Sequence, residues 1–412
     1  MSNWNGPWRA LLLGAVTAAA SLSPQQAQAA NPDCSTISGG APILYGAGGS
    51  AQRPLVMKAA AVLEGATNPV WLVYKDDGGA CTGINALAGL SGTTITGNAK
   101  YWDPAAASGA GAEATCTLSL AGDEVQFASM GNTPFLCPLV TDPSLVADIV
   151  DVTGPISTVN VLVPNASTQQ AISAEAFYLI YGFGASAGVA PWTNASTDYF
   201  VHRNNDSYVQ NYLALATGLP SAKFYGADAG SNTNTITLLT GLAAPEAGIG
   251  FASGEVADAN RATVRTLAWQ QTGQNVAYWP DSSATAFDKI NVRTGAYYLW
   301  GPGHFYALKG ATAGSYDNAN AKVLLEYLSG LSQPAGTTKT ITDLAIANKN
   351  VPTCAMNVQR DGDLTPIYAY HPAAPCGCYF DFKATGSSTC TTCDDANPCS
   401  TGVCRYGYCE AN

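Results

Sequence analysis

Short apolar segments of two kinds alternate from residue 42 to about residue 330, and this alternation limits the possible folds more than any other feature. One kind has the length and composition of β-strands, as in PILY, PVWLVY and TVNVLVP. The other kind has helical spacing of its apolar residues, as in LVMKAAAVLEG and AKVLLEYLSGL. Such alternation indicates α/β architecture, for which we expect mainly parallel sheets. The Gly-, Ala- and Ser-rich stretch 91–116 is predicted to be a loop tied down by Cys81 and Cys116.

The first residues have the pattern of an export signal. Arg9 precedes the apolar run ALLLGAVTAAASL, and AQA at 27–29 is a small-x-small cleavage site. The run is too short for a typical transmembrane helix, and no other segment reaches about 18 apolar residues. We therefore expect a soluble periplasmic or extracellular protein whose mature chain begins near Ala30. A retained N-terminal anchor is the alternative.

The chain has 12 cysteines, and five of them crowd the segment CTTCDDANPCSTGVCRYGYC near the C-terminus. An even number of cysteines in an exported chain favours disulfides. A zinc site is the alternative, but this segment contains no histidine. We therefore expect a small disulfide-rich tail without a metal, in which the pairing cannot be read from the sequence.

The charge of the chain excludes two classes of partner. The net charge is −11, and charged residues make up only 11% of the sequence. No basic run or stripe is present, so neither nucleic acid nor an anionic membrane is an expected partner. We expect a monomer that does not insert into membranes.

A glycine-rich loop joins the first predicted strand to the first predicted helix, in PILYGAGGSAQRPLVMKAAAVLEG. Backbone N–H groups at such a helix N-terminus can hold a negatively charged group. Gly46, Gly48 and Ala51 also match the G-x-G-x-x-A pattern of dinucleotide sites. The acids that would bind ribose, Asp76 and Asp77, lie about 30 residues further on instead of about 20. A small oxyanion is therefore the preferred ligand, and no cofactor is expected.

Catalytic patterns are weak in this sequence. GASAG around Ser186 matches G-x-S-x-G, but a nucleophile elbow needs a preceding strand, and AEAFYLIYGFG is predicted to be a helix. His202, His304 and His371 have no metal-type spacing. RDGDLTP (360–366) is interpreted as a polar turn. We expect a binding protein and not an enzyme, with an exported hydrolase using Ser186 as the alternative of another class.

An ordered set of segments resembles the phosphate-binding proteins of bacterial ABC transporters. GAGGSAQRPL resembles the first ligand loop of that family, G-A-G-A-T-F-x-x-P-L, and VYKDDGGACTGINAL is similar to the second segment. VQFASMGNTPF resembles the third, D-F-G-A-S-D-x-P-L, and VHRNNDSYVQNYLAL resembles the R-x-D-x-S-G-T segment. AISAEAFYLIYGFGASAGVAPWTN and AGIGFAS resemble the opening of the second domain and the strand that returns toward the hinge. The set covers residues 42–330.

The resemblance implies a two-lobed type 2 periplasmic binding protein fold with a hinge, to which the tail is added. The expected parts are a signal peptide (1–29), lobe 1 (30–150 and 286–350), lobe 2 (151–285) and the cysteine-rich tail (351–412). The implied function is capture of phosphate or a related oxyanion between the lobes for delivery to an ABC transporter permease. The alternative is a non-transport secreted or surface interaction protein with a degenerate cleft.

The resemblance also assigns the ligand contacts. Ser50 would bind the ligand through its hydroxyl and N–H, and Arg203 and Ser207 would approach from lobe 2. The full set of expected ligand-binding residues is Gly49, Ser50, Ala51, Gly79, Thr82, Asn132, Arg203 and Ser207.

Three positions depart from the family pattern. The aromatic residue of the first loop is Ala51 here, the acid of the third loop falls on Gly131 or Asn132, and Gly-Thr after Ser207 is Tyr208-Val209. In the family, the missing acid accepts a hydrogen bond from protonated phosphate. The sequence therefore does not decide which oxyanion is bound.

Overall fold

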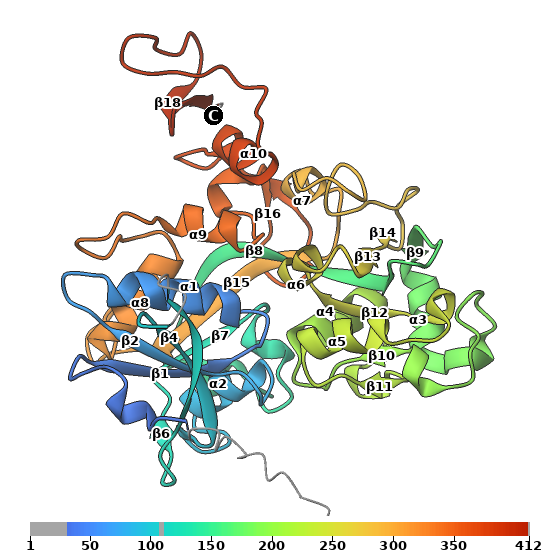
Figure 1. Ribbon diagram of the computed structural model, residues 1–412, viewed down its shortest axis with the longest axis horizontal. Helices are drawn as coiled ribbons and strands as arrows, with labels where there is room; N and C mark the ends of the chain where they lie inside the picture. The colour runs from blue at the N-terminus through green and yellow to red at the C-terminus, as the bar shows by residue number, and fades with distance from the viewer. Residues whose placement is uncertain (1–30, 107–110, 411–412) are drawn as a thin grey trace, which may run out of the picture. The chain divides into compact units, whose positions relative to one another are not determined.

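Two groups of helices and strands lie on either side of two long strands, β8 (Ile149–Pro164) and β15 (Trp300–Leu308) (Figure 1). The computed structural model describes residues 31–106 and 111–410. The predicted export signal lies outside these residues. In the described part of the chain, no helix is both long and apolar enough to cross a membrane.

Nine strands of the described chain form one mixed sheet. Its order is β12 (Gly250–Ser253), β8, β15, β7 (Phe127–Met130), β1 (Ile43–Gly48), β2 (Trp71–Lys75), β4 (Asn98–Asp103) and β5 (Ala112–Thr117), with β13 (Val264–Thr266) also paired to β8. β1 runs parallel to β2 and β7, whereas the pairs made by β4, β8 and β15 are antiparallel. The α/β fold class is therefore confirmed, but the expectation of mainly parallel pairing is wrong. Within this sheet parallel pairing is confined to β1, β2 and β7, the strands that alternate with α1 and α2.

The stretch 91–116 is not a loop throughout, because it contains β4 and most of β5. Ala99 and Tyr101 alternate inward along β4, as a half-buried strand requires. The two cysteines expected to hold this stretch are not bonded to each other. Cys116 pairs with Cys34, and Cys81 pairs with Cys137.

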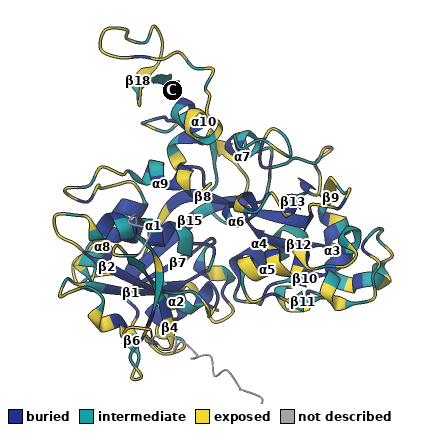
Figure 2. Cartoon of the chain, in the orientation of Figure 1, coloured by how far each residue is buried: buried dark blue, intermediate teal, exposed yellow. Residues whose placement is uncertain are grey.

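β8 passes through both groups of elements. Its residues 149–158 pair with β15, and its residues 159–164 pair with β12 and β13. We call the group around β1, β2, β4, β5 and β7 lobe 1, and the group around β12 and β13 lobe 2. Strands β1, β7 and β8 are buried over most of their length (Figure 2). The residue limits predicted for the two lobes stay a prediction.

Helices cover the lobe 1 sheet with apolar faces. α1 (Arg53–Glu64) starts with Pro54 in its first turn, where a missing N–H costs nothing. Its buried Val56 and Leu63 join one apolar cluster with Leu44 of β1 and Leu324 of α8 (Ala319–Leu328). The other helices of lobe 1 are α2 (Cys81–Leu87) and α9 (Ile341–Ala347).

Lobe 2 is built around aromatic rings. Phe177 of α3 (Ala174–Phe183) lies within 4.5–6.0 Å, between ring centroids, of Tyr181, Phe224, Phe251 and Trp269. The N-cap Ser173 fixes the start of α3 by accepting from the N–H of Ala176. The remaining helices here are α4 (Tyr208–Thr217), α5 (Asn232–Thr240), α6 (Gly254–Ala259) and α7 (Ile290–Arg293). Short strand pairs complete the lobe: β9 (Ala171–Ser173) with β14 (Ala268–Gln270), and β10 (Val201–His202) with β11 (Ala227–Asp228).

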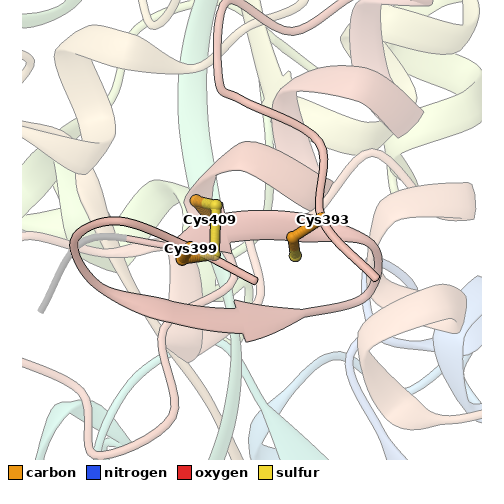
Figure 3. Close-up of side chains that lie close together, drawn as sticks. All are labelled: Cys393, Cys399 and Cys409. Atoms are coloured by element: carbon orange, nitrogen blue, oxygen red, sulfur yellow. A yellow bond between two sulfur atoms is a disulfide. The ribbon is translucent and has the colours of Figure 1, made fainter. Parts of the chain in front are cut away.

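The C-terminal tail is a disulfide-rich segment, as expected. It contains β16 (Val358–Gln359), β17 (Tyr368–Ala369), α10 (Gly377–Thr385), and the hairpin of β18 (Val403–Arg405) and β19 (Tyr408–Glu410). Its four disulfides are Cys354–Cys376, Cys378–Cys390, Cys393–Cys404 and Cys399–Cys409. The sulfurs of Cys393, Cys399 and Cys409 lie close together (Figure 3), but all three are in disulfides. They therefore offer no thiolate to a metal ion.

Candidate functional site

A small cavity lies where the first-loop residues of lobe 1 meet the helix N-termini of lobe 2. Its walls are Gly49, Ser50, Ala51, Ala80, Arg203, Ser207, Tyr208 and Asn232. Its volume of about 10 Å³ is close to the smallest that can hold one water molecule. In this arrangement of the lobes the cavity therefore has room for about one water molecule, and a five-atom oxyanion requires the lobes to move apart.

The lobe 1 wall of the cavity is the loop that follows β1, and contacts with other residues of lobe 1 fix its position. A Cβ on Gly46 would come within 2.2 Å of the Phe127 ring, so only glycine fits there. The Gly49 carbonyl accepts from the Tyr74 hydroxyl at 3.1 Å, and its N–H donates to the carbonyl of Ser129. Ser50 follows directly, and among the described residues its hydroxyl has no hydrogen-bond partner. The loop thus presents Ser50 at the start of α1.

The lobe 2 wall is made of helix starts. Ser207 is the N-cap of α4, yet its hydroxyl makes no capping hydrogen bond. Asn232 is the first residue of α5. The N-termini of α4 and α5 therefore border the cavity, and α1 begins two residues after the wall residue Ala51. Each helix N-terminus carries a partial positive charge. Together they favour an anion without a full counter-charge.

Arg203 supplies the only full charge on the cavity walls. It is 3% exposed, its Nη1 donates to Asn232 Oδ1 and its Nη2 to the Gly230 carbonyl, both at 2.9 Å. Its Nε is buried without a hydrogen-bond partner, and no carboxylate of the described chain forms a salt bridge with this side chain. Burial lowers the pKa of the guanidinium to about 10, while Asp228 opposes that shift. Arg203 is therefore charged at neutral pH and lacks a neutralising partner.

Direct contacts join the two lobes beside the cavity. The N–H of Ala80, at the start of α2, donates to the carbonyl of Asp206 at 2.8 Å. Asn211 Nδ2 of α4 donates to the Leu136 carbonyl at 3.4 Å. The lobes are thus in contact around the cavity.

Tyr208 connects the cavity to a buried carboxyl group. Its hydroxyl lies 3.2 Å from Ser157 Oγ on β8, which in turn donates to Glu255 Oε2 at 2.9 Å. Glu255 opens α6, and burial raises the pKa of its carboxyl to about 7. A carboxyl group that titrates near neutral pH therefore stands two hydrogen bonds from the cavity wall.

Five of the eight expected ligand-binding residues line the cavity: Gly49, Ser50, Ala51, Arg203 and Ser207. The other three do not. Gly79 packs against Asp206, Thr82 is the second residue of α2, and Asn132 Nδ2 donates to the Thr133 carbonyl. The ring of Tyr208 lies against Gly131, the neighbour of Asn132 in the third loop. The ring therefore occupies the space that a side chain at position 131 would need.

Three residues of the wall are absent from the expected set. Ala80 lies next to the expected Gly79, so a register error of one residue explains it. Tyr208 follows Ser207, and both residues line the cavity. Asn232 lies on α5 and carried no sequence signal beyond that of an ordinary helix start. Its contact with Arg203 is visible only in the fold.

The features that suggested other chemistry have structural partners. Asp76 forms a salt bridge with Arg53 at 2.7 Å, and Ser186 Oγ donates to the Phe183 carbonyl at 2.6 Å in a 3-10 turn. His304 Nδ1 lies 2.9 Å from Asp151 on the antiparallel pair of β15 and β8. None of these groups lines the cavity.

No family model matches the chain, and no curated protein matches it by sequence. Among solved structures, a proposed phosphate ABC transporter substrate-binding protein of Clostridium perfringens with bound phosphate matches with a TM-score of 0.51 at 12% identity, covering 76% of this chain and 99% of that chain. An ABC-type phosphate transport receptor of Vibrio cholerae matches with a TM-score of 0.45 at 12% identity, covering 75% and 99%. A phosphate-binding protein of Stenotrophomonas maltophilia gives 0.43 at 15% identity, covering 75% and 90%. The first match shows that this chain has the fold expected from the resemblance.

Proposed function

We propose that this protein is an exported solute-binding protein that captures one small oxyanion in the cavity between its lobes. The observation that carries the proposal is Arg203, a buried cation without a carboxylate partner at a cavity that is bordered by the N-termini of α4 and α5, with α1 beginning close by. A buried unpaired charge is costly, and an anion in contact with it would remove that cost. The proposal extends the shared fold to a shared class of ligand, for which the Clostridium perfringens protein with bound phosphate is the model.

The hydroxyls of Ser50 and Ser207 would complete the site, because neither is used elsewhere in the described structure. Hydrogen bonds from hydroxyl and guanidinium groups to a charged oxygen are stronger than those between neutral groups. No wall residue is an acid. Sulfate, which carries no proton at neutral pH, is therefore as reasonable a ligand as phosphate.

The test is titration calorimetry with sulfate and with phosphate. The protein is first unfolded, dialysed and refolded, because a tight ligand would otherwise remain bound. We expect one site per chain and an affinity that is micromolar or tighter for at least one oxyanion. If neither sulfate nor phosphate binds, the proposal is wrong.

Delivery to an ABC transporter is the proposed use of this binding. Cells that lack the protein should take up the bound oxyanion more slowly at micromolar external concentration, and the wild-type chain should restore uptake. Restoration by a variant that no longer binds the anion would contradict a transport role.

A second candidate is a non-transport interaction protein with a degenerate cleft. Tyr208 favours it, because its ring fills the space beside Gly131 in the third loop. This candidate predicts that the wild-type protein does not bind the anion and that replacing Tyr208 by Gly creates binding.

A further inference from the structure

Two adjoining cavities lie between the tail and the rest of the chain. The first, of about 310 Å³, is bordered by the C-terminal end of α8, the start of α9 and the turn after β18. The second, of about 240 Å³, is bordered by β8, β15 and β16. They share the wall residues Ser329 and Thr353. Each is near the lower end of the range of about 300–1,000 Å³ that is typical of small-molecule sites.

Arg360 lines the second cavity without a carboxylate partner. Its guanidinium carbon lies 4.1 Å from the centre of the Trp300 ring, and its Nη2 makes only a long contact of 3.4 Å with the Tyr298 carbonyl. Nε and Nη1 are buried and have no hydrogen-bond partner. The nearest acids in sequence are used elsewhere, Asp361 by the Tyr368 hydroxyl and Asp363 by Thr133. The stacking on Trp300 holds the guanidinium in place, and the long contact leaves Nη2 without a strong acceptor.

Arg405 on the first cavity repeats this arrangement. It forms no salt bridge within the described chain, and its Nε is buried without a partner. Glu410, the nearest acid in sequence, accepts instead from the N–H groups of Cys378 and Tyr379, both at 2.9 Å. Acids outnumber bases 29 to 18 in this chain, so two arginines without acidic partners on adjoining cavities are unexpected unless a ligand uses them.

The remaining walls combine donors with apolar surface. Thr153, Ser329 and Thr353 contribute hydroxyls, whereas Met356 and Val358 contribute apolar side chains. No acid lines either cavity. These walls suit a molecule with an anionic group and a hydrocarbon part.

We propose that the cavities under the tail form a second binding site, which takes a small organic anion whose carboxylate pairs with Arg360. A carboxylate oxygen would give Nη2 a charge-assisted hydrogen bond in place of its long contact with the Tyr298 carbonyl. The hydrocarbon part lies against Met356 and Val358, and a second carboxylate can reach the neighbouring cavity with Arg405. This site is independent of the oxyanion cavity.

The test is titration calorimetry with benzoate, succinate and citrate in the Arg203→Met background, in which binding at the first cavity is weakened. We expect at least one of these anions to bind with a stoichiometry of one. Arg360→Gln should weaken that binding at least tenfold. Arg265→Gln is the matched control, because Arg265 donates to the Asn165 carbonyl in lobe 2, away from both cavities.

A second variant, which blocks the cavities, tests the proposal even if Arg360→Gln does not fold. Thr353 is exposed and lines both cavities, so Thr353→Trp fills them without removing either arginine. It should abolish binding of the organic anion and leave sulfate or phosphate binding unchanged in a chain with Arg203 intact. Absence of binding by all three anions, or binding that survives both Arg360→Gln and Thr353→Trp, would overturn the second site and leave the proposed oxyanion site untouched.

Discussion

Tyr208 of lobe 2 occupies the space that a side chain on Gly131 of lobe 1 would need. A Cβ built on Gly131 would come 2.4 Å from Tyr208 Cε2, well inside van der Waals contact. The two residues thus form a close contact between the lobes, beside the cavity that contains Arg203. Because Tyr208 also lines that cavity, the contact ties the cavity wall to the packing of the lobes.

Gly131→Ala should destabilise the protein by about 1–3 kcal/mol, because the added methyl group overpacks this contact. Urea unfolding measures the change. Gly182→Ala is the control, since its Cβ would meet Leu219 at an ordinary 3.6 Å within α3. In a helix that substitution should be neutral or slightly stabilising.

The strain in Gly131→Ala should disappear when Tyr208 is also shortened. The double variant Gly131→Ala/Tyr208→Ala should therefore be more stable than the sum of the single effects predicts. Strict additivity would show that the two residues do not press on each other.

Arg203→Met should weaken oxyanion binding by about 1.5–3 kcal/mol, the range for hydrogen bonds to charged groups, which is about 10- to 150-fold in affinity. Calorimetry with the preferred anion measures the loss. Arg265→Met removes an arginine of lobe 2 that contacts only backbone carbonyls, so it should bind like the wild type. Equal affinity of Arg203→Met and wild type would show that the ligand does not contact Arg203.

Glu255 should make the stability of the protein depend on pH. Burial raises the pKa of its carboxyl from 4.5 to about 7 in the folded chain. Between these values the folded state holds a proton that the unfolded state has lost, so stability falls as pH rises from about 4.5 to about 7. The full effect is about 3 kcal/mol, and it levels off above pH 7.

Glu255→Gln removes this effect and keeps the shape of the side chain. We expect the loss of unfolding free energy between pH 5 and pH 8 to be about 2.5 kcal/mol smaller in this variant than in the wild type. Denaturant titrations at the two pH values supply the comparison. Parallel pH profiles for the two proteins would mean that Glu255 does not titrate in this range.

Some disulfides should stabilise the whole fold, whereas others should stabilise only the tail. Cys34–Cys116 links residues 82 apart and joins the N-terminal segment to β5, so replacing both by Ser should lower the global stability by about 2–5 kcal/mol. Cys399–Cys409 links residues only 10 apart within the tail. Its replacement should open the tail to proteolysis while the unfolding midpoint of the lobes changes little. The reverse pattern would contradict this division.

The strands and helices with strong periodicity were predictable from the sequence, and those with mixed composition were not. PILY, PVWLVY and AGIGFAS lie in β1, β2 and β12, and LVMKAAAVLEG lies in α1. The segment WGPGHFYAL contains Pro302 between two glycines, which argues against a strand. It forms β15 nevertheless, because β7 and β8 pair with it on both sides and a register shift after Pro302 absorbs the missing donor.

In the candidate site too, residues linked by a local sequence pattern were predictable, and residues brought together only by the fold were not. The loop from Gly49 to Ala51 lies next to its helix in sequence, and Arg203 lies four residues before Ser207, so local pattern was sufficient to place them. Asn232 joins the cavity only because α5 packs beside β10 and β12, which no local pattern records. The cavities under the tail were not predicted, since their walls come from β8, α8 and the tail, which are far apart in the sequence.

β8 gives one hydrogen-bond ladder to lobe 1 and another to lobe 2 without a break in the strand. Loss of the ladder in one lobe frees one end of the strand that carries the other ladder, so the free energies of the two halves are coupled. The protein should behave as one cooperative unit in hydrogen exchange, with the amides along β8 exchanging only through global unfolding.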